Sequence, residues 1–147
     1  MHLTVSYSIL FREARERAGL STAEAARRMC VSTSALKGIE SEDDELPSVH
    51  SAADVQRFGS VLGVRSCELL GVESQAEPLT AEELAALICN HCRERGKPIG
   101  AFEDAAGWCV GRSLEKPERL LHDYSISGIQ DICRELDVAW ERFIMSL

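Results

Sequence analysis

Apolar residues recur every three or four positions over most of the chain, which is the spacing that places them on one face of a helix. No stretch alternates apolar and polar residues between hairpin turns, as a strand of a sheet would. The pattern therefore predicts an all-α fold. The expected helices cover residues 7–18, 21–29, 32–40, 51–62 and 66–70, followed by 80–95, 99–108, a broken segment over 112–122, 127–136 and 139–146.

Polar residues and glycines mark where several of these helices begin and end. Three pairs have the spacing of a capping box, in which a hydroxyl and a carboxylate three residues later satisfy free amides of the first turn. They are Ser21 with Glu24, Thr80 with Glu83 and, in a weaker version, Ser51 with Asp54. Glycines follow four of the apolar stretches, where a left-handed residue ends a helix at little cost. They are Gly19, Gly63, Gly71 and Gly96.

The stretch from Gly71 to Leu79 has the composition of a linker and separates two sets of helices. We therefore predict a first domain over residues 1–71, a linker over 72–79 and a second domain over 80–147. The 147 residues are enough for two units of roughly 70 residues, each near the lower size limit for an independent core. A second unit packed on the first would relieve that limit.

The two halves of the sequence resemble each other. The segment 15–17 (Arg-Glu-Arg) matches 93–95 at a distance of 78 residues, and further matches occur at distances of 79 and 74 residues. They join Glu24, Ala26, Cys30, Val31 and Ser34 to Glu103, Ala105, Cys109, Val110 and Ser113, and Val55, Gln56, Leu62 and Val64 to Ile129, Gln130, Leu136 and Val138. Residues 1–77 and residues 78–147 each contain 8 basic and 12 acidic side chains. An ancient duplication is the simplest explanation.

Residues 20–40 have the spacing of two short helices that cross around a tight turn. Ala26 stands where only a small side chain allows two helices to approach closely, and Val31 would fill the turn. Leu36 and Ile39 lie on one face of the second helix, which would pack on the core.

This spacing resembles the lambda-repressor and Cro-like, or XRE-type, helix-turn-helix family, most clearly over residues 8–71. The resemblance implies two tandem five-helix units of the repressor type, of which the second, over 80–147, is degenerate. In such a unit the later helix lies in the major groove of double-stranded DNA, and the earlier helix crosses the backbone. The resemblance thus implies a sequence-specific DNA-binding regulator of transcription that acts through the first helix-turn-helix.

The same resemblance assigns contacts to five residues. Thr33, Ser34 and Lys37, at the start of the later helix, become candidates for contacts with bases or nearby phosphates. Thr22 and Arg28, on the earlier helix, become candidates for contacts with the DNA backbone. The alternative is that the hydroxyl residues from Ser32 onward only begin a helix.

The charge of the chain opposes this function. The formal net charge is −8, so the average field repels nucleic acid. Acidic residues fill most of 40–45, directly after the expected recognition helix, and Lys37 is the one basic residue within that helix. This acidic run is either a solvated surface turn or a contact for a basic partner. Six basic residues within 12–37 would form a local basic face unless they pair with glutamates such as Glu24 at helical spacing.

Two backbone positions also depart from the family's pattern. Cys30 occupies a turn position where members often have glycine, and a left-handed conformation there would cost about 1 kcal/mol. Gly38 would weaken the recognition helix by up to about 1 kcal/mol.

The second unit contains a proline inside the counterpart of the recognition helix. Pro117 removes a helical hydrogen bond, so we expect it to interrupt the helix. A broken helix cannot lie in a groove as one rod, and residues 80–147 therefore serve packing, a homodimer or a protein partner. Apolar residues would supply either that contact surface or an ordinary core. They are Trp108, Trp140, Phe143 and Ile144.

A second function class follows from the net charge and Pro117. The chain could be a protein interaction module, antitoxin-like or an adaptor, with a helix-turn-helix fold that has lost DNA binding.

The remaining motifs indicate no catalysis. Cys89, His91 and Cys92 have a zinc-like arrangement, but no second pair of cysteines follows, so we predict no metal. The four histidines accompany no nucleophile motif, and no glycine-rich phosphate loop is present. We therefore expect a protein that is not an enzyme and uses no cofactor or small-molecule substrate. His50 and His122 are expected as surface or capping residues.

The location follows from what the chain lacks. No apolar run has the length of a membrane span, and the first residues do not have the pattern of a secretion signal. The sequence therefore predicts a cytoplasmic protein in which the six cysteines stay reduced.

Overall fold

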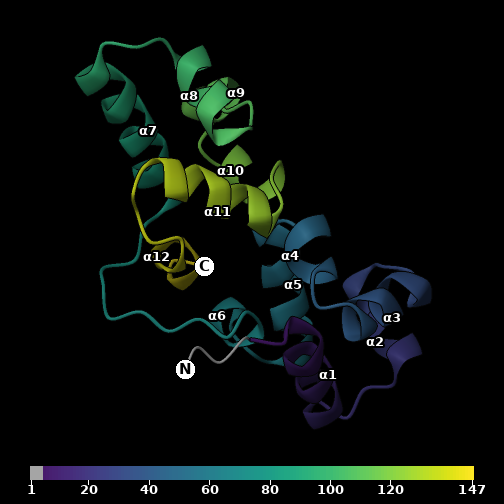
Figure 1. Cartoon of the computed structure of the whole chain (residues 1–147). Coiled ribbons are helices and arrows are strands. Elements are labelled where there is room, and N and C mark those ends of the chain that lie inside the picture. The colour runs from purple at the N-terminus through teal and green to yellow at the C-terminus, as the bar shows by residue number, and fades with distance from the viewer. Residues whose placement is uncertain (1–4) are drawn as a thin grey trace.

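The computed structural model describes residues 5–147, and these form twelve α-helices and no strand (Figure 1). The all-α prediction is confirmed. The helices are α1 (Tyr7–Arg17), α2 (Thr22–Met29), α3 (Thr33–Ser41), α4 (Glu45–Val49), α5 (Ala52–Leu62), α6 (Ser66–Leu69), α7 (Ala81–Arg95), α8 (Ile99–Ala106), α9 (Gly111–Glu115), α10 (Arg119–His122), α11 (Ile126–Glu135) and α12 (Glu141–Met145). Below, residues 5–71 are the first half and residues 80–147 are the second half.

The helices lie close to the expected ranges, with one addition. Helix α4 was not predicted, because it is a single short turn. It begins at Glu45, the last residue of the acidic run, and contributes Leu46 and Pro47 to the interior. Pro47 falls early in that helix, where its missing N–H removes no intrahelical bond. The interruption expected at Pro117 is confirmed, since α9 ends at Glu115 and α10 begins two residues after the proline.

The predicted capping boxes do not all close. The pair expected to be weaker, Ser51 and Asp54, forms the complete reciprocal box, with hydrogen bonds of 3.1 and 3.2 Å. Ser21 accepts the amide of Glu24 at 3.1 Å, but the Glu24 carboxylate binds arginines instead of returning to the Ser21 amide. Thr80 likewise accepts the amide of Glu83 without a reciprocal backbone bond.

Left-handed residues end the helices where expected. Gly19, Gly63, Gly71 and Gly96 all have positive φ angles. Cys30 ends α2 with φ 59° and ψ 39°, which is the conformation expected to cost about 1 kcal/mol in a residue with a Cβ.

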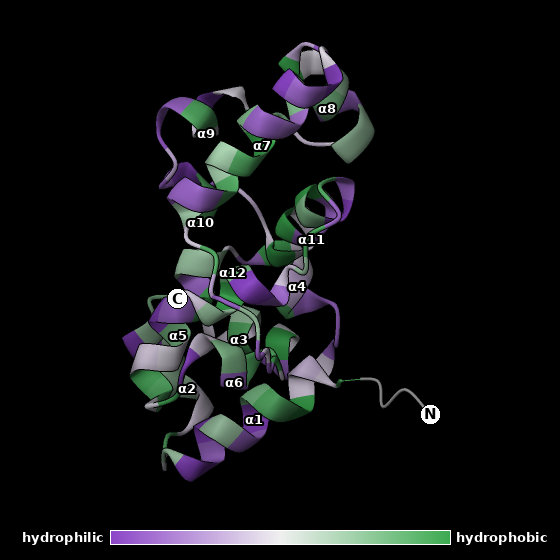
Figure 2. Ribbon diagram, turned by 90° about the vertical axis from the view of Figure 1, so that its left-hand side faces the viewer, coloured by the Kyte–Doolittle hydropathy of each residue, from purple (hydrophilic) through white to green (hydrophobic). Residues whose placement is uncertain are grey.

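One hydrophobic core extends through both halves. Apolar stripes on the helices (Figure 2) meet in a continuous cluster, in which Phe11 and Phe58 stack edge to face with ring centroids 6.0 Å apart. Phe143 and Ile144 are buried, whereas Trp108 and Trp140 are half-buried against the same core. These four side chains therefore pack in the core rather than forming an open apolar surface.

The two halves pack against each other through their middle helices. Helix α4 lies on α11, α10 lies on α5, and α12 lies on α6 (Figure 1). The amide of Ile126 donates to the carbonyl of His50 at 3.1 Å, and the amide of Leu79 donates to the carbonyl of Arg142 at 2.9 Å. Because Leu79 is buried, part of the segment predicted as a linker packs against the protein. The domain boundaries themselves remain a prediction.

His50 was expected as a surface or capping residue. It is the C-cap residue of α4, but its side chain does not lie on the surface: it is buried, with its ring edge to face against Phe58 at 5.1 Å between centroids. Its Nδ1 atom lies 3.4 Å from Asp54, and its Nε2 atom has no hydrogen-bond partner in the described part of the chain. His122 is exposed, as predicted.

The cysteines are all free thiols, and Cys30 and Cys109 are exposed. Burial raises the pKa of Cys133 to about 12, so this thiol is unreactive. Residues 5–147 contain no group of three potential metal-binding side chains. Over the same residues, no helix combines the length and apolar character needed to cross a bilayer.

Candidate nucleic-acid interface

Helices α2 and α3 cross around the tight turn expected from the sequence. Ala25 and Ala26 are buried, so the two helices can approach closely. Val31 follows the left-handed Cys30 and packs against the core from a half-buried position. On α3, Leu36 and Ile39 are fully buried. The helix is therefore held firmly by one face.

The opposite face of α3 is open to solvent. Thr33, Ser34 and Lys37 are all exposed, and spacings of three and four residues place them on one side of the helix. The Ser32 hydroxyl accepts the amide of Ala35 at 3.0 Å and so begins the helix. The second half does not cover these three side chains. The face that they form at the N-terminal part of α3, called its leading face below, is therefore accessible to a large ligand.

Lys37 makes no ion pair within residues 5–147. Glu40 stands three residues later, at a spacing that allows pairing with Lys37. Instead, Glu40 binds the Arg15 guanidinium at 2.7 Å, in a pair whose side chains are only 9% and 12% exposed. Glu40 thus joins α3 to α1 and leaves the Lys37 ammonium available.

The acidic run after α3 is partly structural. Asp43 accepts hydrogen bonds from the hydroxyls of Ser8 and Ser6 and from the Ser8 amide, at 2.5, 2.8 and 3.3 Å. These bonds, first those from Ser8, lower the pKa of Asp43. The carboxylate therefore lies at the amino end of α1, where the helix dipole favours negative charge.

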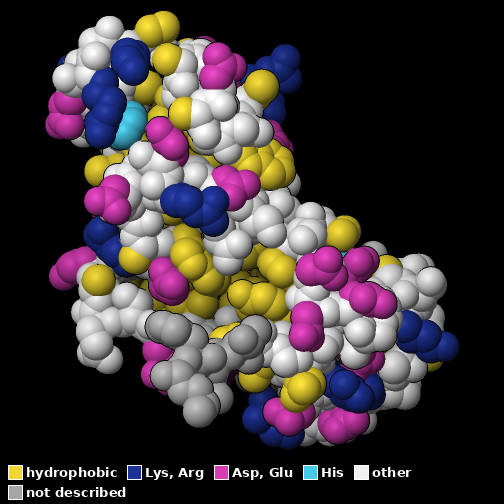
Figure 3. Space-filling view, viewed as in Figure 1, with side chains coloured by type: hydrophobic (Ala, Val, Ile, Leu, Met, Phe, Trp, Pro, Cys, Tyr) yellow, Lys and Arg dark blue, Asp and Glu magenta, His cyan; other side chains and the backbone are white. Residues whose placement is uncertain are grey.

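The other acidic residues of this run differ in exposure. The carboxylate of Glu45 lies close to the Gly38 backbone and is half-buried, whereas Glu42 and Asp44 are exposed. Figure 3 shows acidic side chains gathered in the region of the α3–α4 connection. The exposed acidic charge near α3 is therefore smaller than the sequence alone indicates, although it does not vanish.

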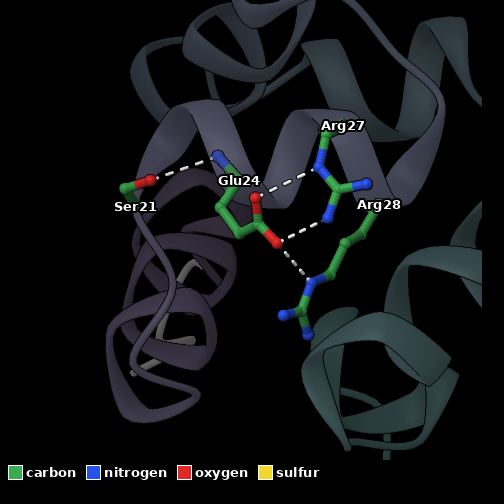
Figure 4. Close-up of polar contacts among 4 residues, drawn as sticks. All are labelled: Ser21, Glu24, Arg27 and Arg28. Atoms are coloured by element: carbon green, nitrogen blue, oxygen red, sulfur yellow. Dashed lines mark hydrogen bonds and ion pairs between the residues drawn. The ribbon is translucent and has the colours of Figure 1, made fainter.

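Arg28 shares a carboxylate with its neighbour on α2 (Figure 4). Glu24 accepts hydrogen bonds from Arg27 at 2.7 and 3.1 Å and from Arg28 at 2.8 Å. These bonds, first those of Arg27, lower the pKa of Glu24 to about 2. The carboxylate is ionised at neutral pH and offsets part of the charge of two arginines whose side chains are 71% and 51% exposed. Such exposed pairs exchange easily with other anions.

Thr22 lies apart from Arg28. It is the first residue of α2 and is half-buried. Six helical residues turn the two side chains about 120° away from each other. The structure therefore brings Thr33, Ser34 and Lys37 together on one face, but it does not bring Thr22 and Arg28 together.

Arg57 is a basic residue near the turn that the sequence did not reveal. Its Nε atom donates to the carbonyl of Met29, at the end of α2, at 3.0 Å. A second guanidinium nitrogen binds Asp54 at 3.1 Å, and the side chain is 44% exposed. Met29 and Arg57 are 28 residues apart, so no local pattern could have indicated this contact.

Asp54 is held in its ionised form by the same group of residues. Burial alone would raise the pKa of this carboxyl group. The Ser51 amide and the charges of Arg57 and His50 outweigh burial, and the pKa lies below its usual value.

The corresponding part of the second half is built differently. Helix α9 has only five residues, and its first amides are already bound. Glu103 accepts the amides of Val110 and Gly111 at 2.6 and 3.2 Å. Tyr124 is buried beside them and donates to the Cys109 carbonyl at 2.5 Å. This region therefore presents no long open helix end comparable with that of α3.

Comparison with known proteins agrees with the geometry of the first half. A protein-family model described as "Helix-turn-helix domain" matches residues 7–77. Searches among curated proteins and among solved structures give no match.

Proposed function

We propose that the protein is a sequence-specific DNA-binding regulator of transcription, because residues 7–77 match a helix-turn-helix family model and this match supports the XRE-like type. The family suggests a DNA-binding regulator in general. The finer proposal is that α3 enters the major groove and that α2 contacts the backbone beside it.

The observation that supports this proposal is the open leading face of α3. Thr33 and Ser34 can donate to base edges or phosphates, and Lys37 can reach a guanine or a phosphate. The nearest carboxylate on the same helix is bound elsewhere, since Glu40 pairs with Arg15. A polar, unpaired and rigidly supported face suits a surface that must match a groove.

The backbone contacts involve an exchange of anions. Arg28 is bound to Glu24 in the free protein, and we propose that a phosphate replaces this carboxylate when DNA binds. Thr22 is the first residue of α2, so it would contact a phosphate only where the N-terminus of this helix approaches the DNA. Because the net charge is −8, binding depends on these few local contacts and weakens steeply as salt rises.

A regulator of this kind requires no catalytic group, cofactor or small-molecule substrate. Its family is typically non-enzymatic. We accordingly propose that the protein acts in the cytoplasm as a non-enzymatic DNA-binding protein.

The test is a selection from random duplexes at low salt, followed by titration of the selected duplex. We expect saturable binding that weakens with salt. Lys37→Ala should reduce affinity roughly tenfold, or about 1.4 kcal/mol. Lys97→Ala is the matched control, because it removes a lysine of the second half that is also exposed, and it should leave affinity unchanged. If no duplex binds saturably, or if both variants lose affinity equally, the proposal is wrong.

A second candidate function rests on the exposed Glu42 and Asp44. Together with the net charge, they favour an interaction module, antitoxin-like or an adaptor, that binds a basic protein. A pull-down with the full chain should then recover one protein, and Glu42→Gln with Asp44→Asn should abolish the recovery. Recovery of nucleic acid alone would count against this candidate.

A further inference from the structure

Two helices of the second half, α8 and α11, resemble α2 and α5 of the first half in their length and in how they begin or end. Helices α2 and α8 are both eight residues long, and each ends in a left-handed residue. These residues are Cys30, with φ 59°, and Gly107, with φ 82°. The structure thus places Gly107, rather than the Cys109 matched from the sequence, at the position of Cys30.

Helices α5 and α11 show a second correspondence. Ser51 and Ser125 precede them in extended backbone, and each hydroxyl accepts the amide three residues later, at 3.1 Å in both cases. A left-handed residue follows each helix, Gly63 in the first half and Asp137 in the second. Both pairs are 74 residues apart, which is the distance of the sequence matches found in this region, from Val55 to Val64 in the first half.

The contacts between the halves are reciprocal. Helix α4 of the first half packs on α11 of the second half. In the reciprocal contact, α10 packs on α5. Here α10 is the counterpart of α4, and α5 is the counterpart of α11. Two pairs of counterparts also meet each other directly, since α6 contacts α12 and Ser51 forms an antiparallel bridge with Ser125. An interface between two subunits related by a two-fold axis has both features. Away from the axis, each contact occurs twice with the partners exchanged, and at the axis equivalent elements meet each other.

The symmetry fails at the recognition helix. Helix α3 has nine residues, whereas its counterpart α9 has five and stops before Pro117. The carboxylate of Glu103 binds the amides of Val110 and Gly111 and so occupies the start of α9 from within the chain. Only one of the two related positions therefore has an open recognition helix.

We infer that the second half stands where a symmetric partner subunit would stand, and that the protein binds one asymmetric DNA site as a monomer. This inference rests on the proposed function. Two-fold regulators present two equivalent helices to half-sites about 34 Å apart, and their operators are palindromic for that reason. In this protein, α10, α11 and α12 of the second half already cover the surface of α4, α5 and α6. The second half thus takes the place of a partner subunit, but it has no recognition helix equivalent to α3.

The experiment uses the full chain and the duplex obtained by selection. Native mass spectrometry of the complex should show one protein per duplex at all protein concentrations that saturate binding. The selected sequence should lack two-fold symmetry. A palindromic sequence bound by two chains would overturn the inference while leaving the proposed function intact.

A second duplex sharpens the test. It contains two copies of the selected site, inverted and one helical turn apart. We expect each copy to bind with the affinity of the single site, without cooperativity, because α10, α11 and α12 already cover the surface of α4, α5 and α6. Cooperative binding of two chains at this spacing would contradict monomeric recognition. Failure of every duplex to bind would overturn the proposed function, and the inference with it.

Discussion

The partners of three carboxylates in the first half determine which charges near α2 and α3 remain accessible. Glu40 neutralises Arg15 inside the protein, Asp43 binds the amino end of α1, and Glu24 bridges two exposed arginines. Of the three, Glu24 is the one whose partners are accessible to DNA. The charge of individual residues, rather than the net charge of the chain, therefore decides whether a phosphate can approach.

The first prediction at this scale concerns Glu24. Replacing it by Gln should release Arg27 and Arg28 for phosphates, so affinity for DNA should rise and its salt dependence should steepen by up to about 1 unit for each arginine that gains a phosphate. Titration by fluorescence anisotropy at several salt concentrations measures both. Glu94→Gln changes the net charge equally in the second half and should have no effect. An unchanged or weaker affinity in Glu24→Gln would show that these arginines do not face DNA.

The second prediction concerns Asp43. Because its pKa is lowered in the folded protein, its stabilisation is complete above the ordinary aspartate pKa near 4 and is lost as the pH falls through the lowered pKa. Asp43→Asn should therefore lower the melting temperature at neutral pH, and the difference from wild type should shrink below about pH 4. The exposed neighbour Asp44 is the control, and Asp44→Asn should melt like wild type. Equal effects of the two variants would mean that the bonds to Ser6 and Ser8 contribute nothing specific.

Residues that contact distant parts of the chain were the hardest to predict from sequence. Thr33, Ser34 and Lys37 are exposed as expected, because helical spacing alone opposes them to Leu36 and Ile39. The contact of Arg57 with Met29 and the packing of His50 against Phe58 were not predicted, because these partners come from elements that meet only in the folded protein.

At the scale of elements, helical periodicity predicted most of the fold. Eleven of the twelve helices in the described residues were expected, with Pro117 correctly placed at the interruption between α9 and α10. Helix α4 was not predicted, since one turn of helix is too short to show a periodic pattern. The complete capping box at Ser51 also exceeded expectation, because Asp54 returns to the Ser51 amide while Glu24 binds arginines instead of Ser21.

The third prediction compares two glycines inside helices. In α3, a Cβ at Gly38 would lie 3.5 Å from the end of the Glu45 side chain, which is an ordinary contact. Gly38→Ala should therefore stabilise the protein by about 0.5–1 kcal/mol through better helix propensity. In α5, a Cβ at Gly59 would lie only 2.6 Å from the Val64 carbonyl oxygen, so Gly59→Ala should destabilise the protein by about 1–3 kcal/mol. Urea unfolding measures both, and a loss of stability in Gly38→Ala would show that α3 is more tightly enclosed than described.

At the scale of the whole molecule, the arrangement of the halves could not be derived from sequence. The side chains between them, such as Leu46 and Ile126, are fully buried and do not differ in type from those inside each half. The sequence repeat suggested two related units, but it gave neither their mutual orientation nor the contacts at Ser51 and Ser125. The packing of the second half on the first covers α4, α5 and α6 but leaves α3 open. The proposed mode of DNA binding depends on α3 being open.

Contact between DNA and the leading face of α3 can be measured residue by residue in NMR spectra of the full ¹⁵N-labelled chain, titrated with the selected duplex. We expect the largest amide shift changes at Thr33, Ser34 and Lys37, smaller changes along α2, and little change from Gly111 to His122. Changes confined to the second half, or the absence of any change along α3 at saturation, would contradict binding through α3.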